Sequence, residues 1–96
     1  MKITKEDYPH LWEACQVICY DNGAVNRYHP EKTEFELNIG PKGAETAEHG
    51  LSQLSEDDFE TFCIGEESDQ TEIRERIPGL QIASNILNEW FDEGMP

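Results

Sequence analysis

The chain has 96 residues, 36% of them hydrophobic, and its 21 Asp and Glu residues against 7 Lys and Arg residues give a formal net charge of −14. This length fits a single domain, residues 1–96, because domains typically have about 100–150 residues. The negative charge excludes nucleic acid and anionic membranes as direct partners, since both attract positive surfaces. The expected partner is instead a basic protein surface. No apolar run approaches the roughly 18–20 residues of a transmembrane helix, so we expect a soluble protein.

The cysteines and the start of the chain predict a cytoplasmic location. Neither an apolar signal segment nor a cleavage pattern of small residues follows Met1. Three cysteines do not make a disulfide framework, which needs an even number. A reducing compartment is therefore expected.

The expected core depends on a few large side chains, namely Trp12, Phe59, Phe62, Trp90 and Phe91. Cores of domains this small rarely supply more than about 3–5 kcal/mol of stability, which leaves a homodimer open. In that case the aromatic end of the last helix would be a contact surface. The simpler expectation is that Trp90 and Phe91 both complete the core.

The first predicted element is a helix that starts close to Pro9, since proline is tolerated only in a first turn. Thr4 and Asp7 precede it as a weak variant of the capping box. Its apolar face recurs at helical spacing and consists of Tyr8, Leu11, Trp12, Cys15, Ile18 and Cys19. Asp21-Asn22-Gly23 is expected to end the helix.

Two short extended stretches follow, at 24–28 and 33–39. In the second, Phe35, Leu37 and Ile39 alternate with polar residues, the period of a strand with one buried face. We expect these stretches to form a β-hairpin. The Gly40 to Gly43 segment then predicts a loop.

Three helices are expected in the second half of the chain. Ser55 is the predicted N-cap of the first, which Gly65 ends. A short helix runs from Ser68 or Asp69 to Ile77, and the last begins at about Leu80 and stops at Gly94. The fold class is therefore α+β: an N-terminal helix, a β-hairpin, then about three helices packed on the small antiparallel sheet.

Charge is the most distinctive feature of the sequence, because ten acidic residues and no Lys or Arg lie between Gly43 and Ile73. Carboxylates on adjacent helical turns lie about 5–6 Å apart, comparable to the several-ångström spacing of nucleic-acid phosphates. Such a face would imitate a nucleic-acid backbone and bind a basic groove. The alternative is a solvated face that only keeps the protein soluble. The predicted partner-binding residues are Glu56, Asp57, Asp58, Glu60, Glu66, Glu67 and Asp69.

The cysteines and histidines are the other residues that could carry chemistry, as metal ligands or catalytic groups. Cys15 and Cys19 lie on one helical face, and together with Cys63 and a histidine they supply the ligand types of a zinc site. Their spacing is not that of a zinc knuckle, so packing in the core is the better interpretation. The histidines, His10, His29 and His49, are scattered, and no nucleophile turn accompanies them. We therefore predict no catalytic residue, no metal and no cofactor.

Parts of the second half resemble a known group of proteins. Three segments carry the resemblance: Leu54 to Phe62 (LSEDDFETF), Gly65-Glu66-Glu67, and Leu87 to Gly94 (LNEWFDEG). They are similar to small acidic proteins carried by bacteria, phages and mobile gene cassettes. The resemblance implies an accessory protein that acts on another protein, a class that includes inhibitors resembling nucleic acid.

The leading hypothesis is therefore a non-enzymatic protein whose acidic face binds a basic partner. One alternative is a small-molecule-binding or catalytic domain with a pocket between the hairpin and the last helix. The other is a structural protein that associates with its own copies.

Overall fold

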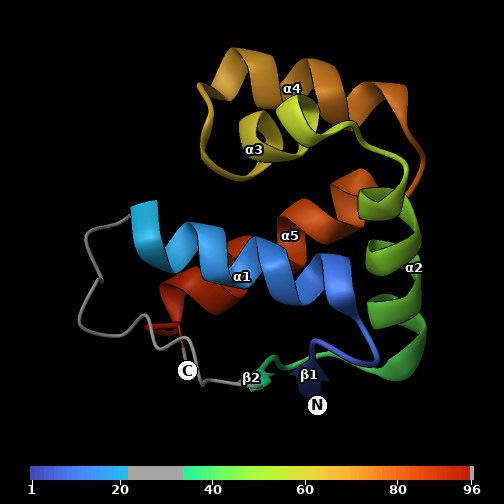
Figure 1. The fold of residues 1–96 in the computed structure, drawn as a ribbon, viewed down its shortest axis with the longest axis vertical. Coiled ribbons are helices and arrows are strands. Elements are labelled where there is room, and N and C mark those ends of the chain that lie inside the picture. Colours follow the sequence, from blue (N-terminus) through green and yellow to red (C-terminus); the bar gives the residue numbers. More distant parts are fainter. Residues whose placement is uncertain (22–33, 96) are drawn as a thin grey trace.

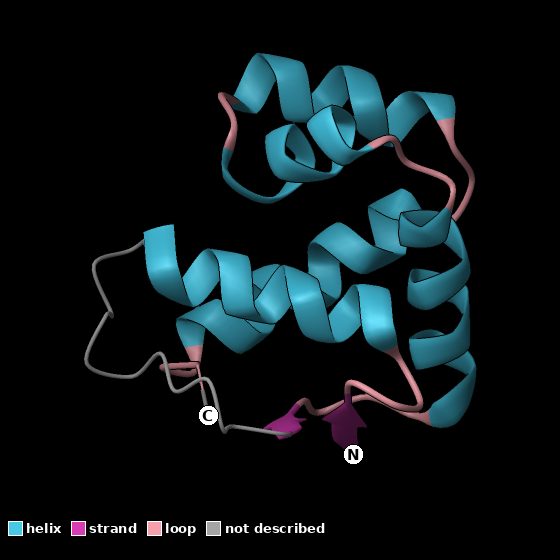
Figure 2. Cartoon of the chain, viewed as in Figure 1, coloured by secondary structure: helices cyan, strands magenta, loops and turns pink. Residues whose placement is uncertain are grey.

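The computed structural model of the chain describes residues 1–21 and 34–95. In this part of the chain the predicted α+β class is confirmed, with five helices and one two-stranded antiparallel sheet (Figures 1 and 2). In chain order the elements are β1 (Lys2–Thr4), α1 (Pro9–Asp21), β2 (Glu34–Glu36), α2 (Pro41–Ser52), α3 (Glu56–Ile64), α4 (Glu67–Arg76) and α5 (Leu80–Asp92). Figure 2 shows the sheet on one side of α1 and the α3–α4 pair on the other.

The sheet joins the amino terminus to the middle of the chain. Ile3 of β1 lies opposite Phe35 of β2, and both side chains are buried. The terminal amine of Met1 donates a hydrogen bond to the Leu37 carbonyl oxygen at 2.7 Å. An amino-terminal strand was not expected, because its three residues contain a single apolar side chain. The predicted strand at 24–28 lies outside the described residues.

Helix α1 begins at Pro9, as expected. Thr4 Oγ1 accepts a hydrogen bond from the Asp7 backbone N–H at 3.1 Å, but this contact closes the turn before α1 and does not cap the helix. Along the helix, Leu11, Cys15 and Ile18 are buried at helical spacing.

Helix α2 corrects the prediction of a loop after Gly40. Gly40 is the N-cap, and Pro41 occupies the first turn, where a proline has no hydrogen bond to lose. The buried face of α2 is made of small residues and one leucine: Ala44, Ala47, Gly50 and Leu51. Small side chains let α2 pack closely against α1 and α5.

Helices α3 and α4 form an antiparallel pair. Ser55 Oγ accepts a hydrogen bond from the Asp58 backbone N–H at 3.2 Å, so the predicted N-cap is confirmed. Gly65 ends α3 as expected. Helix α4 starts earlier than predicted, since its N-cap is Glu66 rather than Ser68 or Asp69.

Helix α5 passes behind α1 in the view of Figure 1 and packs against α2. The Phe35 ring lies between two tryptophans, 6.2 Å from the Trp12 centroid and 5.6 Å from the Trp90 centroid, with the second pair edge to face. Trp90 is 1% exposed, whereas Phe91 is 40% exposed and does not complete the core as expected. Of the other predicted core aromatics, Phe62 is buried and Phe59 is partly buried.

Among the described residues, no helix combines the length and the apolar character needed to cross a membrane.

Candidate functional site: an acidic cleft between two helices

The structure separates the seven predicted partner-binding residues. Glu56 and Glu60 lie on the side of α3 that faces α1, where both line a cleft. Asp57 is exposed on another side of α3. Asp58 faces α4 and accepts a hydrogen bond from Arg76 Nη2 at 3.2 Å.

The remaining three residues lie at the start of α4. Glu66 is its N-cap, and Glu67 and Asp69 are in its first turn, where negative charge is favourable because helix N-termini are partly positive. The Asp58–Arg76 contact joins the start of α3 to the end of α4, so the start of α4 lies at the opposite end of the pair. Because α3 is about 13 Å long, the seven carboxylates do not form one continuous face.

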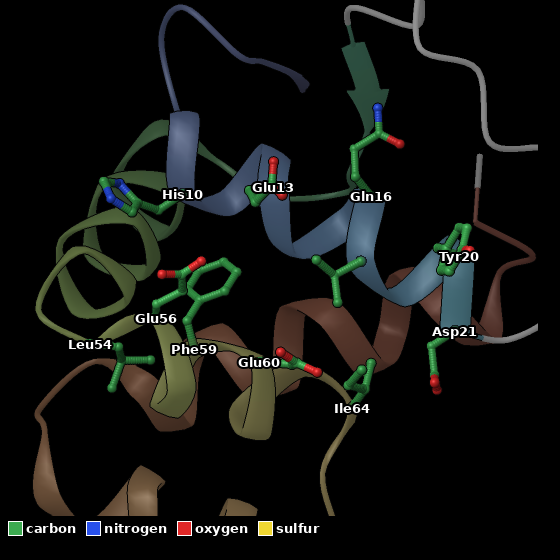
Figure 3. A pocket seen from close by; sticks show the side chains of 11 residues that line it. His10, Glu13, Gln16, Tyr20, Asp21, Leu54, Glu56, Phe59, Glu60 and Ile64 are labelled. Atoms are coloured by element: carbon green, nitrogen blue, oxygen red, sulfur yellow. The ribbon is translucent and has the colours of Figure 1, made fainter.

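A cleft lies between α1 and α3 and has a volume of about 890 Å³. Figure 3 shows the side chains that line it, with Phe59 and Glu56 pointing from α3 toward α1. The lining residues are His10, Glu13, Gln16, Val17, Tyr20, Asp21, Leu54, Glu56, Phe59, Glu60 and Ile64. The alternative hypothesis of a small-molecule-binding or catalytic domain placed its pocket elsewhere, between the hairpin and the last helix.

Four carboxylates surround this cleft, two on each wall. Glu13 and Asp21 come from α1, and Glu56 and Glu60 come from α3. The last two are four residues apart and therefore about 5–6 Å apart on the helix surface. None of the described residues that line the cleft is Lys or Arg, so the cleft attracts cations.

The floor of the cleft is apolar. Val17 from α1 and Phe59 and Ile64 from α3 are partly buried, as is Leu54 in the α2–α3 connection. Their remaining exposed surface lines the cleft. Covering such surface stabilises a complex by about 25 cal/mol per Å².

One end of the cleft is held by a contact between α1 and α2. The Glu48 carboxylate accepts hydrogen bonds from the backbone N–H groups of His10 and Leu11, with Oε1 at 3.0 Å and 2.8 Å from the two nitrogens. The His10 ring also bonds to Glu48 through Nδ1. This arrangement positions the first turn of α1 and orients the His10 ring at the cleft.

The cysteines lie in or beside the core. Cys15 and Cys19 are buried, and Cys63 is partly buried among core residues. Burial raises the pKa of the Cys63 thiol to about 12, and the charge of Glu13 adds to the effect. Within residues 1–21 and 34–95 no three His, Cys, Asp or Glu side chains are grouped as a metal site would require. His49 is exposed, and His29 lies outside the described residues.

The sequence did not single out Glu13 and Asp21 as site residues. Glu13 belongs to the first predicted helix and Asp21 to the segment expected to end it, and neither gave a signal beside the acidic run in the second half of the chain. Their positions eight residues apart on α1 place them along one wall of the cleft. No protein-family model, curated protein or solved structure matches the chain.

Proposed function

We propose that this protein is a non-enzymatic accessory protein that binds a basic surface of another protein. The observation that carries the proposal is the cleft between α1 and α3, where four carboxylates surround an apolar floor and no described lining residue is cationic. This cleft is the site of contact, and Glu56 and Glu60 are the predicted residues that belong to it.

The charge of the whole chain supports the same partner. A net charge of −14 on 96 residues produces a negative field that steers a basic protein toward the surface before contact. The carboxylates at the start of α4, Glu66, Glu67 and Asp69, add to this field from the far end of the helix pair. Their effect is on the rate of association more than on the final contacts.

A nucleic-acid-binding protein is the class of basic partner that the proposal favours. Such proteins present Lys and Arg side chains at the spacing of phosphates, and Glu56 and Glu60 offer two negative charges about 5–6 Å apart. The protein would then occupy a surface that nucleic acid otherwise covers.

The experiment is a pull-down from a lysate of the source organism at low and at high salt. The test variant carries Glu56→Lys and Glu60→Lys. The control carries Glu67→Lys and Glu72→Lys, which change the net charge equally but do not line the cleft. Each pair replaces the first residue of a helix and one exposed residue further along it.

We expect a basic protein that the wild type and the control retain and that the test variant loses. Raising the salt from about 0.1 M to 1 M shortens the Debye length from about 10 Å to about 3 Å, so the partner should be released. Retention that is equal for both variants, or that does not change with salt, would contradict the proposal.

A further inference from the structure

We infer that the segment bound in the α1–α3 cleft is an amphipathic helix of the partner, with an apolar side chain between flanking Lys or Arg residues. This inference rests on the proposed function, since it specifies which part of a basic partner is bound. It is carried by the composition of the cleft, in which an apolar floor lies between two acidic rims.

A helix fits the walls better than an extended strand does. Both walls are helices, whose backbone N–H and C=O groups are already paired within the helix. The sheet contacts α1 on the side away from α3 (Figure 2). An extended segment in the cleft would leave its own backbone groups without partners on an apolar floor, at a cost that a helix avoids.

The length of the cleft sets the length of the segment. Its lining residues on α1 run from His10 to Asp21, and eleven helical steps span about 16 Å. A helix that follows this wall therefore contacts it over about three turns, or about eleven residues.

The two acidic rims set the pattern of the bound side chains. Glu56 and Glu60 on α3 fit two cations three or four residues apart on a facing helix, because that spacing repeats the same distance. Glu13 on the opposite wall fits a cation on the other flank. Between them, Val17 and Phe59 leave apolar surface for a leucine or a similar side chain.

The shape of the cleft matters as much as its charge, and two peptides separate these effects. The first is an amidated peptide of about 14 residues, built from Leu, Ala and Arg, with leucine at positions i, i+3, i+4 and i+7 and arginine on both flanks. The second has the same composition and charge in an order that disperses leucine around the helix. Spermidine serves as a small cation without a helix.

Titration of the isotope-labelled full chain, followed by amide chemical shifts, measures affinity and location together. We expect the first peptide to bind at least about tenfold more tightly than the second, because only the first presents a continuous apolar stripe to the floor of the cleft. The shift changes should follow the α1 and α3 residues that line the cleft. Contacts between leucine methyl groups and the Phe59 ring should appear as intermolecular nuclear Overhauser effects in the wild-type protein.

A pair of aromatic variants tests the floor. Phe59→Ala should lower the affinity for the first peptide several-fold and leave the second unchanged. Phe91→Ala, at an exposed aromatic on α5 outside the cleft, should change neither. The wild-type Overhauser measurement keeps the inference testable if Phe59→Ala does not fold.

Three results would overturn the inference, and they differ in what they imply for the proposed function. If the two peptides bind with equal affinity and the shift changes centre on the start of α4, the partner is still basic but does not bind in the cleft. If spermidine binds as tightly as the first peptide and causes the same shift changes, the ligand of the cleft is a small cation and not a helix. If neither peptide binds at low salt, the inference of a bound helix is wrong. If the pull-down also finds no salt-dependent basic partner, the proposed function is wrong as well.

Discussion

Glu48 in the middle of α2 caps the first turn of α1 through His10, from a position 38 residues later in the chain. The carboxylate is only 17% exposed, and it bonds to the His10 backbone, the His10 ring and the Leu11 backbone. A helix usually obtains its N-terminal cap from a residue directly before it. Here the cap is a tertiary contact, so the position of α1 beside the cleft depends on α2.

Removing this cap should destabilise the fold. We expect Glu48→Ala to lower the free energy of unfolding by about 1–2 kcal/mol, because two helix N–H groups lose their acceptor near a partly positive helix end. Glu48→Gln keeps an acceptor and should cost less. Urea denaturation measures both, and Glu45→Ala, at an exposed position of α2, is the control. A loss at Glu45 as large as that at Glu48 would show that the capping contact is not the cause.

Gly79 should not tolerate a side chain. It starts α5 with φ +94°, and a Cβ added there would lie 3.1 Å from the Thr46 carbonyl oxygen of α2. We expect Gly79→Ala to lower the melting temperature, at a cost of about 1 kcal/mol or more from backbone strain and crowding. Gly43→Ala is the matched control, since its Cβ would meet only Ile86 Cδ1 at 3.9 Å. Inside helix α2 this second change should stabilise by about 0.5–1 kcal/mol.

The adjacent residues Asp57 and Asp58 should respond differently to charge reversal. Asp58→Lys breaks the contact with Arg76 and places two cations side by side, whereas Asp57 has an exposed position. Both partners of the ion pair are partly exposed, so we expect its loss to cost only about 0.2–1 kcal/mol. A double-mutant cycle of Asp58→Ala and Arg76→Ala measures the coupling, because neither change introduces a new charge. A coupling of zero would mean that the pair does not hold α3 against α4.

The sequence predicts elements well where one residue type has a local role. Ser55 accepts the bond of an N-cap, and Gly65 ends α3, because both effects depend on neighbours within a few residues. The stripe of α5 was also predicted, from Leu80 to Trp90, because its large apolar residues recur at helical spacing.

The sequence is a poor guide where packing decides. Helix α2 was missed because Gly40 and Pro41 are typical of loops and because Ala44 and Ala47 give a weak apolar signal. They form a helix face only because α1 and α5 cover them. The pairing of Ile3 with Phe35 joins residues 32 positions apart, which no local pattern contains.

The cleft was missed for the same reason. Its rims come from two helices whose acidic residues are far apart in the chain, with Glu13 on one wall and Glu56 and Glu60 on the other. The acidic run suggested an acidic face, but order in the chain does not determine whether its carboxylates converge on one side. The helix pair instead turns Asp58 toward Arg76 and takes the start of α4 to the far end, so only Glu56 and Glu60 of the predicted residues line the cleft.

The Cys63 thiol should make stability fall at alkaline pH. Its pKa is raised to about 12 in the folded protein by burial and by the charge of Glu13, while an unfolded thiol has a pKa of about 8.5. Above that pH the unfolded chain loses the proton first, so unfolding becomes more favourable as pH rises. The contribution is fully present below about pH 8 and declines by at most about 1.4 kcal/mol per pH unit above about pH 9.

Cys63→Ala removes this titration and is the direct test. Urea denaturation of wild type and variant under reducing conditions, from about pH 7 to pH 10, gives the difference in unfolding free energy at each pH. Other groups that titrate in this range affect both proteins and cancel in the difference. We expect the advantage of the wild type to shrink steadily above about pH 9. Parallel curves would mean that the folded protein exposes Cys63 to water and that Glu13 has no effect on the pKa of its thiol. A steeper fall in the wild type that Glu13→Gln reduces would show that the thiol lies beside the acidic wall of the cleft.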